Sequence, residues 1–300
     1  MIASRELLRH TASIDLTALR PRLLGLAYRM LGDYDEAEDV VQEAYLRWQG
    51  ADQNAIKSPE AWIVTVATRL AVDRLRLLGA QRANYPGPWL PEPIATDVSA
   101  TPNDAAELAS DLSMALLVLL EQLRPDERAA FLLREVFDTD YDEIARILER
   151  SPAAVRQMVH RARERVHAGR PRVAVAPGEH ERLLERFRVA LAEDDAARVI
   201  ALVSPDVVLT SDGGGKASAA RRQLVGRDRV TRLLLGVTRK ARLTYRLTHL
   251  NGEPALLAFR DTTLASAYTF EIDSSGIRAI NVMRNPDKLS HTVRPGEAIE

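Results

Sequence analysis

The sequence predicts a multidomain chain in which an all-α N-terminal half precedes an α+β domain. Residues 14–80 and 107–166 carry apolar side chains at helical spacing, and a proline-rich segment separates them. Beyond residue 178 the period changes, and short runs with strand character alternate with turn signals. We therefore expect two helical domains and a third domain of about 110 residues, which is a common domain size.

The composition excludes several classes of protein. The chain has 300 residues, of which 46% are hydrophobic and 28% charged, as in ordinary soluble proteins. No window approaches the roughly 18 apolar residues of a membrane span, and the N-terminus lacks the apolar core of a signal peptide. Absent cysteine excludes disulfides, zinc–thiolate sites and a thiol nucleophile. We expect a cytoplasmic protein without metal, cofactor or membrane partner.

Three helices are expected in the first helical segment. Apolar residues 19–30 recur at helical spacing, and Gly32 marks a break. A second helix is expected over 35–48 and a third over 58–78. At the start of the third helix, Ser58-Pro59 is a capping residue followed by a first-turn proline.

Two irregular segments divide the rest of the chain. Residues 83–104 contain five prolines and are expected to form a linker. A second break is expected at 168–178. Between these segments, an apolar helix over 107–123 leads into a further pair of helices.

Residues 141–166 indicate a helix-turn-helix. The first helix starts at Asp140, with Glu143 at the spacing of a capping box. Ser151 caps the second helix, and Pro152 takes its first turn. An apolar stripe on that helix contains Val155, Val159, Ala162 and Val166, and a basic stripe contains Arg156, His160 and Arg163, with Gln157 and Arg161 beside it.

The second helix of the pair can pack on its partner and still offer donors to a DNA major groove. The alternative is a solvated arginine-rich helix. Residues 146–172 contain eight arginines against two glutamates, whereas the whole chain has a formal net charge of −1. This local excess favours DNA binding, and the near-neutral chain favours local contacts that depend on a partner.

The C-terminal part is expected to be α+β. Residues 179–203 have a helical pattern, and Asn251-Gly252 and Ser275-Gly276 are turn signals. The runs with strand character are 206–210, 243–250, 255–259, 262–272 and 277–283.

With these features the chain resembles a bacterial sigma factor of the extracytoplasmic-function (ECF) class. DYDEAEDVVQEAYLRW (33–48) resembles the signature of sigma region 2, and SPEAWIVTVATRLAVDRLR (58–76) resembles its promoter-melting segment. WLPEP (89–93), DGGGK (212–216) and NPDKL (285–289) together look like the subgroup with a C-terminal SnoaL-like domain, a cone-shaped fold of the nuclear-transport-factor-2 type.

The resemblance implies a transcription initiation factor with region 4 ending in the helix-turn-helix. It implies region 2 at 1–82, a linker at 83–106, region 4 at 107–170, a linker at 171–178, the SnoaL-like domain at 179–290 and a tail at 291–300.

The helix over 35–48 is acidic and amphipathic. Between Leu31 and Trp48 there are six acids against one base, Arg47. Such a helix can dock on a basic surface by charge and aromatic anchoring. The resemblance implies that the partner is core RNA polymerase, with Asp39, Gln42 and Glu43 best placed. The alternative is that this helix only packs inside its own domain. The helix can also do both, because its apolar stripe and its polar face can be used at once.

The segment 58–76 combines an aromatic residue with arginines, as single-strand binding requires. The resemblance places the preceding loop, 54–58, over the flipped base of the minus-ten element. For Trp62, plain core packing is an equally open alternative. The candidates for minus-ten binding are Asn54, Lys57, Ser58, Trp62, Arg69, Arg74 and Arg76, the arginines as phosphate contacts.

For the minus-35 element, arginine can bind guanine and glutamine can bind adenine. The sequence does not decide which of these side chains contacts a base and which contacts a phosphate. The candidates are Arg156, Gln157, His160, Arg161 and Arg163.

The third domain shows no acid–base cluster, so we expect no enzyme activity. Its three histidines, His180, His249 and His291, and its aspartates Asp206, Asp228 and Asp261 are scattered. DGGGK is not a Walker loop, because Thr210 and Ala217 occupy the positions of the required glycine and hydroxyl. Its glycines permit a sharp turn or a close approach. The resemblance implies that this loop faces the sigma regions, and a simple strand-end turn is the alternative.

We hypothesise that the fused domain is an intramolecular regulator that replaces a separate anti-sigma protein. The resemblance implies that the linker and the C-terminal segment lie near each other. Two alternatives are a ligand-responsive DNA-binding regulator and a SnoaL-like enzyme fused to a DNA-binding module. A small ligand in the SnoaL-like pocket is a possible partner. The regulatory candidates are Trp89, Leu90, Pro91, Glu92, Pro93, Asp212, Gly213, Gly214, Gly215, Lys216, Asn285, Pro286, Asp287, Lys288 and Leu289.

Overall fold

The computed structural model describes residues 15–96, 113–169 and 177–293, and the chain forms two compact units. The first comprises the residues up to 77 and 124–162; the second comprises 78–123 and the residues from 163 onward. Parts of both predicted linkers and most of the predicted tail lie outside the described residues. The limits of the units therefore differ from the predicted domain boundaries, which stay a prediction.

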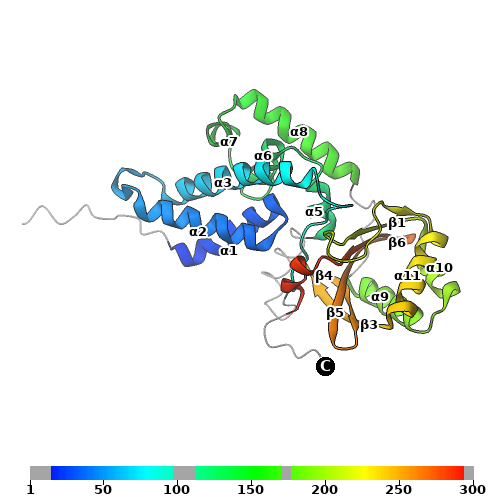
Figure 1. Ribbon diagram of the computed structural model, residues 1–300. Coiled ribbons are helices and arrows are strands. Elements are labelled where there is room, and N and C mark those ends of the chain that lie inside the picture. The colour runs from blue at the N-terminus through cyan, green and yellow to red at the C-terminus, as the bar shows by residue number, and fades with distance from the viewer. Residues whose placement is uncertain (1–14, 97–112, 170–176, 294–300) are drawn as a thin grey trace, which may run out of the picture. The chain divides into compact units, whose positions relative to one another are not determined.

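Six α-helices supply the described part of the first unit, although α3 and α8 run past its limits (Figure 1). They are α1 (Leu16–Leu31), α2 (Tyr34–Gly50), α3 (Pro59–Arg82), α6 (Pro125–Glu135), α7 (Tyr141–Leu148) and α8 (Pro152–Gly169), with a 3-10 helix at Gln53–Ala55. Gly32 ends α1 in the left-handed conformation, and its amide donates to the Tyr28 carbonyl. The break predicted at this glycine is confirmed.

Helix α6 is the element of this unit that the sequence analysis missed. Its Arg128 is 2% exposed and donates to the Met30 carbonyl at 2.7 Å, which ties α6 to the end of α1. A helix-start signal was present, because Pro125 at the first turn is followed by Asp126 and Glu127.

The second unit contains a six-stranded mixed sheet in the order β2-β1-β6-β5-β4-β3. Strands β1 and β6 are parallel, and the other neighbours are antiparallel. The predicted order of an all-helical half followed by an α+β domain is confirmed. The elements are α5 (Met114–Leu120), α9 (Pro177–Ala192), α10 (Ala196–Leu202), α11 (Arg227–Ala241), β1 (Val203–Asp212), β2 (Leu224–Val225), β3 (Leu243–Leu250), β4 (Glu253–Arg260), β5 (Thr263–Asp273) and β6 (Gly276–Met283), with 3-10 helices at Pro286–Lys288 and Ser290–Thr292.

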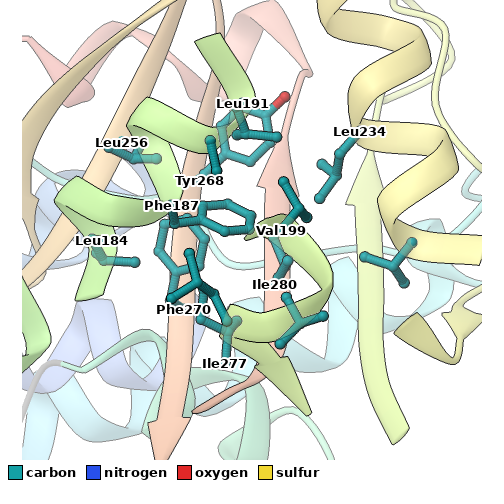
Figure 2. Close-up of a cluster of buried hydrophobic side chains, with 14 of the residues drawn as sticks. Leu184, Phe187, Leu191, Val199, Leu234, Leu256, Tyr268, Phe270, Ile277 and Ile280 are labelled. Atoms are coloured by element: carbon teal, nitrogen blue, oxygen red, sulfur yellow. The ribbon is translucent and has the colours of Figure 1, made fainter. Parts of the chain in front are cut away.

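Helices α9, α10 and α11 cover one side of the sheet, which we call the helix-facing side. Figure 2 shows Leu184 and Phe187 of α9 against Phe270 of β5 and Ile280 of β6. The rings of Phe187 and Phe270 meet edge to face, with centroids 5.7 Å apart. These side chains are almost fully buried, so this cluster is the main core of the domain.

The opposite side of the sheet, the linker-facing side, carries a smaller core. Leu90 of the predicted linker and Val118 of α5 pack there with Leu257 and Leu289. The linker also extends the hydrogen bonding of the sheet, because the Asn251 amide donates to the Ile94 carbonyl at 2.8 Å. The linker and α5 therefore belong to the second unit.

Helix α11 and strand β2 were not predicted. The apolar stripe of α11 consists of Val230, Leu234 and Leu235, which are buried, but arginines and Gly236 interrupt the pattern in sequence. Strand β2 has two residues, too few for a periodic signal. None of the described helices is long and apolar enough to cross a membrane.

Candidate functional site

Helices α7 and α8 form the predicted helix-turn-helix. Glu149 ends α7 in the left-handed conformation, and the Ser151 hydroxyl caps α8 by accepting from the Ala154 amide at 3.2 Å. The predicted apolar stripe of α8 is fully buried, with Val155 and Val159 at 0% exposure. One detail was wrong: the Asp140 side chain makes no capping bond, so the expected capping box at α7 is absent.

The predicted minus-35 residues lie on the solvent side of α8. Arg156, Gln157, His160 and Arg161 are exposed, and Arg163 is half-buried. The Arg156 guanidinium lies 5.7 Å from the Tyr141 ring centroid, and Arg161 pairs with Glu127 at 3.3 Å. This face carries guanidinium, amide and imidazole groups within three turns, the chemistry that base edges and phosphates require.

Helix α2 presents a second exposed face. Asp39, Gln42 and Glu43 are all exposed, and the spacing of helical residues places Leu46 beside them. Leu46 is 59% exposed and is, with Leu77 and Val225, one of three exposed large apolar side chains among the described residues. Leu46 was not predicted, although the sequence places it at i+4 from Gln42 and i+3 from Glu43.

The three candidate arginines of α3, Arg69, Arg74 and Arg76, have partners inside the first unit. Arg69 donates to the carbonyls of Ile147 at 2.9 Å and Arg146 at 3.0 Å, both on α7. Arg74 forms a bidentate pair with Glu36 of α2. Arg76 pairs with Asp126 of α6 at 2.6 Å; Arg150 lies 2.7 Å from the same carboxylate. Through Arg69 and Arg76, α3 is joined to α6 and α7.

Trp62 and the loop before α3 differ in exposure. Trp62 is half-buried and packs on Trp48, with ring centroids 5.5 Å apart, so at least part of its role is structural. Asn54, Lys57 and Ser58 are exposed, and Asn54 sits in the 3-10 helix that the Asp52 carboxylate caps. These three side chains are accessible to a partner.

The three pentapeptide motifs meet at Asp212, the last residue of β1. Asp212 is fully buried, and its carboxylate accepts from the Tyr85 hydroxyl at 2.6 Å and the Leu90 amide at 3.0 Å. The Lys288 ammonium also donates to this carboxylate, at 2.8 Å, and to the Leu90 carbonyl, at 2.7 Å. We call Asp212, Lys288, Tyr85, Leu90 and Trp89 the motif cluster.

Within the motif cluster, the Trp89 ring lies near two cations. The Lys288 ammonium lies 4.1 Å from its ring centroid, and the Arg82 guanidinium lies 3.5 Å from it. Arg82 in turn pairs with Glu121 at 2.8 Å. Burial and the neighbouring Asp212 carboxylate raise the pKa of the Tyr85 hydroxyl, which therefore stays a donor to that carboxylate.

The remaining motif residues pack around this centre. Gly214 and Gly215 have positive φ, and a Cβ would lie 2.4 Å from Asn285 or 2.8 Å from Pro86. The DGGGK loop therefore packs closely against both Pro86 of the linker and Asn285, and it is more than a simple turn. Gly213 is buried, Pro286 is exposed, and Leu289, Pro91 and Pro93 are buried. Lys216 pairs with Asp287 at 2.5 Å.

A contact between Glu92 and His291 joins the linker to the C-terminal segment. Glu92 is 2% exposed, and its carboxylate lies 2.7 Å from Nδ1 of His291. The sequence analysis missed Tyr85, which also accepts from the Asn285 side chain, and Asn251, whose side chain accepts from the Ile94 amide. The Asn251-Gly252 signal indicated only a turn.

The histidines His180 and His249 lie outside the motif cluster. His249 contacts Glu181 at 3.1 Å, and burial together with His249 lowers the pKa of His180 to about 4. In the part of the chain that the structure describes, no three His, Asp or Glu side chains gather as metal ligands.

Comparison with known proteins places this arrangement in a family. The model for Sigma-70 region 2 matches residues 16–80, and that for Sigma-70, region 4 matches residues 113–166. The ECF RNA polymerase sigma factor SigJ of Mycobacterium tuberculosis is 42% identical over 228 residues, which cover 75% of this chain and 73% of that protein.

A second relative and a solved structure cover almost the whole chain. The probable ECF RNA polymerase sigma factor SigI of the same organism is 31% identical over 280 residues, or 91% of this chain and 92% of that protein. The crystal structure of Mycobacterium tuberculosis SigJ has a TM-score of 0.74 at 35% identity and covers 92% of this chain and 97% of that chain. With both helical regions matched and these relatives aligned across both units, the chain belongs to the ECF RNA polymerase sigma factors.

Proposed function

We propose that this sigma factor binds core RNA polymerase through α2, recognises the minus-35 element through α8 and opens the minus-ten element through the loop before α3. The observation that carries the proposal is the exposed face of α8, with Arg156, Gln157, His160 and Arg161, on a helix-turn-helix inside the region 4 match. An acidic face with one exposed leucine suits α2 for a basic polymerase surface.

The first unit corresponds to a closed state. Elements at −35 and −10 lie roughly 85 Å apart on DNA, from a rise of about 3.4 Å per base pair. In the closed state Arg69 and Arg76 of α3 are bonded to α7 and α6, so region 2 and region 4 form one compact body. These bonds must break before the two regions reach both elements, and the freed arginines then become phosphate contacts.

We assign the regulation to the motif cluster. The linker between regions 2 and 4 is held on the α+β domain by Asp212 and Lys288, with Trp89 and Leu90 packed around them. A linker that is held in this way fixes the chain between the two DNA-binding regions. Initiation then requires its release, which makes the α+β domain an intramolecular inhibitor.

A catalytic role of the α+β domain has less support. The domain contains a cavity of about 240 Å³ whose lining includes serine, arginine and tyrosine but no histidine or carboxylate. The acid–base pair that hydrolases and isomerases need is therefore missing from this cavity.

In vitro transcription with core RNA polymerase tests the DNA-binding assignment. Arg156→Ala is expected to weaken promoter binding by about 1–3 kcal/mol if this side chain reads a base. Arg232→Ala changes an exposed arginine of α11 in the other unit and serves as the matched control. Equal affinity of the Arg156→Ala holoenzyme and the parent would remove Arg156 from the interface.

A disulfide lock tests the regulatory assignment in this cysteine-free chain. A Cβ at Gly215 would lie 3.7 Å from the Pro86 Cβ, near the disulfide mean of about 3.8 Å. The double variant Pro86→Cys, Gly215→Cys is expected to be silent when oxidised and active when reduced. Each single variant controls for the strain of a side chain at Gly215. Equal transcription by both forms would refute regulation by linker release.

A further inference from the structure

The cavity in the α+β domain lies between α11 and the helix-facing side of the sheet. Most of its wall is apolar, with Leu209, Leu234, Val237, Tyr268 and Val282 among the lining residues. With a volume of about 240 Å³ it exceeds an engineered apolar cavity of about 150 Å³ that binds benzene. A bicyclic molecule therefore fits, whereas water would find few polar partners along most of this wall.

One end of the cavity is polar and positively charged. Ser211, Ser218 and Arg284 lie there. The Arg284 guanidinium donates to the Ser218 carbonyl, and no acidic side chain among the described residues pairs with it. The Ser211 hydroxyl accepts from the Ala220 amide at 2.8 Å, which leaves its own proton free to donate. Such donors select a carboxylate or a carbonyl.

The polar end of the cavity includes Ser211, one residue before Asp212 at the end of β1, and Arg284, which directly follows the end of β6. Side chains alternate along a strand, so Ser211 faces the cavity while Asp212 faces the linker. The same step separates Arg284 from Asn285, and both of their amides donate to the Asp212 carbonyl, at 2.7 and 3.0 Å. Arg284 and Ser211 are therefore directly connected to Asp212, the residue that holds the linker.

We propose that this cavity binds a small aromatic or alicyclic carboxylic acid, and that its occupancy weakens the hold of Asp212 on the linker. The carboxylate replaces the Ser218 carbonyl as the acceptor of Arg284, and the loop from 213 to 220 loses that anchor. The binding site stands independently of the proposed function. Its consequence for transcription rests on that function.

The probe for the site is 2-naphthoate, titrated calorimetrically into the full chain. Saturable binding is expected, at least tenfold tighter than that of the neutral 2-naphthalenemethanol. Arg284→Gln is expected to abolish this preference, and Val237→Phe, which adds volume at the cavity wall, to abolish binding of both probes. Arg232→Gln, on α11 but outside the lining, is the matched control. No saturable binding, or equal binding by all variants, would overturn the site.

The coupling is measured by hydrogen exchange of the Leu90 and Gly214 amides, both of which donate to Asp212. Saturating 2-naphthoate is expected to speed exchange at both amides at least threefold in the parent, and to leave them unchanged in Val237→Phe. Unchanged exchange in the parent would overturn the coupling. Because neither measurement needs polymerase, this result is distinguishable from a failure of the chain to support initiation.

Discussion

Two pairs of ionisable side chains on the linker-facing side of the sheet, one buried and one partly buried, behave in opposite ways. Asp212 and Lys288 have opposite charges, are 0% and 7% exposed in their side chains, and lie 2.8 Å apart. Glu253 of β4 and Glu271 of β5 carry like charges. Burial, and then Glu271, raises the pKa of Glu253 to about 7, and burial raises the pKa of Glu271 as well.

The difference lies in what surrounds each carboxylate. Asp212 accepts from Tyr85, Leu90, Gly214 and Lys288, so the loss of water is offset by hydrogen bonds. Glu271 has a long contact with the partly exposed Arg278, at 3.8 Å. Burial of charge is therefore compatible with a fixed contact only where several segments of the chain supply donors, as the three motifs do.

The largest effect is expected from Asp212→Ala, which leaves the Lys288 ammonium buried without its counterion. Removing one partner of such a pair costs about 3–5 kcal/mol, most of it the desolvation of the remaining charge. We expect the free energy of opening of β1, measured from hydrogen exchange of its amides, to fall by this amount. Gly214 and Leu90 also lose their acceptor.

The double variant Asp212→Leu, Lys288→Met is the matched control, because it removes both charges and keeps similar volume. It is expected to recover more than half of the loss. If Asp212→Ala cost less than about 1 kcal/mol, the pair would be solvated and the motif cluster would not hold the linker.

The second effect, expected from Glu253→Gln, is a gain in the free energy of unfolding at high pH instead of a loss. The pKa of Glu253 is about 7 in the folded protein and near 4.5 when unfolded, so between these values only the folded state holds the proton. The stability from this proton is full below about pH 4.5 and is lost as the pH rises through 7. Glu253→Gln is therefore expected to stabilise the domain at pH 8 by about 1–3 kcal/mol and to change little at pH 4.5.

Urea unfolding at pH 4.5, 6 and 8 measures this difference. Glu271→Gln removes the like charge and is expected to shift the pH profile of the parent in the same direction by a smaller amount. A Glu253→Gln variant that is equally stable relative to the parent at all three pH values would contradict a raised pKa.

These two pairs also show what a sequence can predict. The three pentapeptides were predicted as regulatory segments, with only the linker and the C-terminal segment expected near each other, and the structure brings all three into contact. Tyr85 was missed, because a tyrosine in a proline-rich linker carries no periodic signal. Glu253 was missed for another reason: alternation places it on a face, but only the fold shows that this face is covered.

The same limit applies to the arginines of α3 and α8. The stripes of α8 were predicted correctly, because both faces follow from helical spacing and neither depends on a distant partner. Arg69, Arg74 and Arg76 carried the same charge signal, yet the structure gives each a partner from another helix. Local chemistry was readable from sequence, whereas pairing between segments 38 or more residues apart was not.

The smallest effect is expected at Lys216 and Asp287, which join the same two motifs as Asp212 and Lys288. Both side chains are 58% exposed, so water and salt screen the pair. Lys216→Ala is expected to change the opening free energy of β1 by less than about 1 kcal/mol, and less in high salt. The measurement is the same hydrogen exchange as for Asp212→Ala, at low and high ionic strength. A loss as large as that of Asp212→Ala would mean that burial does not separate the two pairs, since their residue types and connected segments are alike.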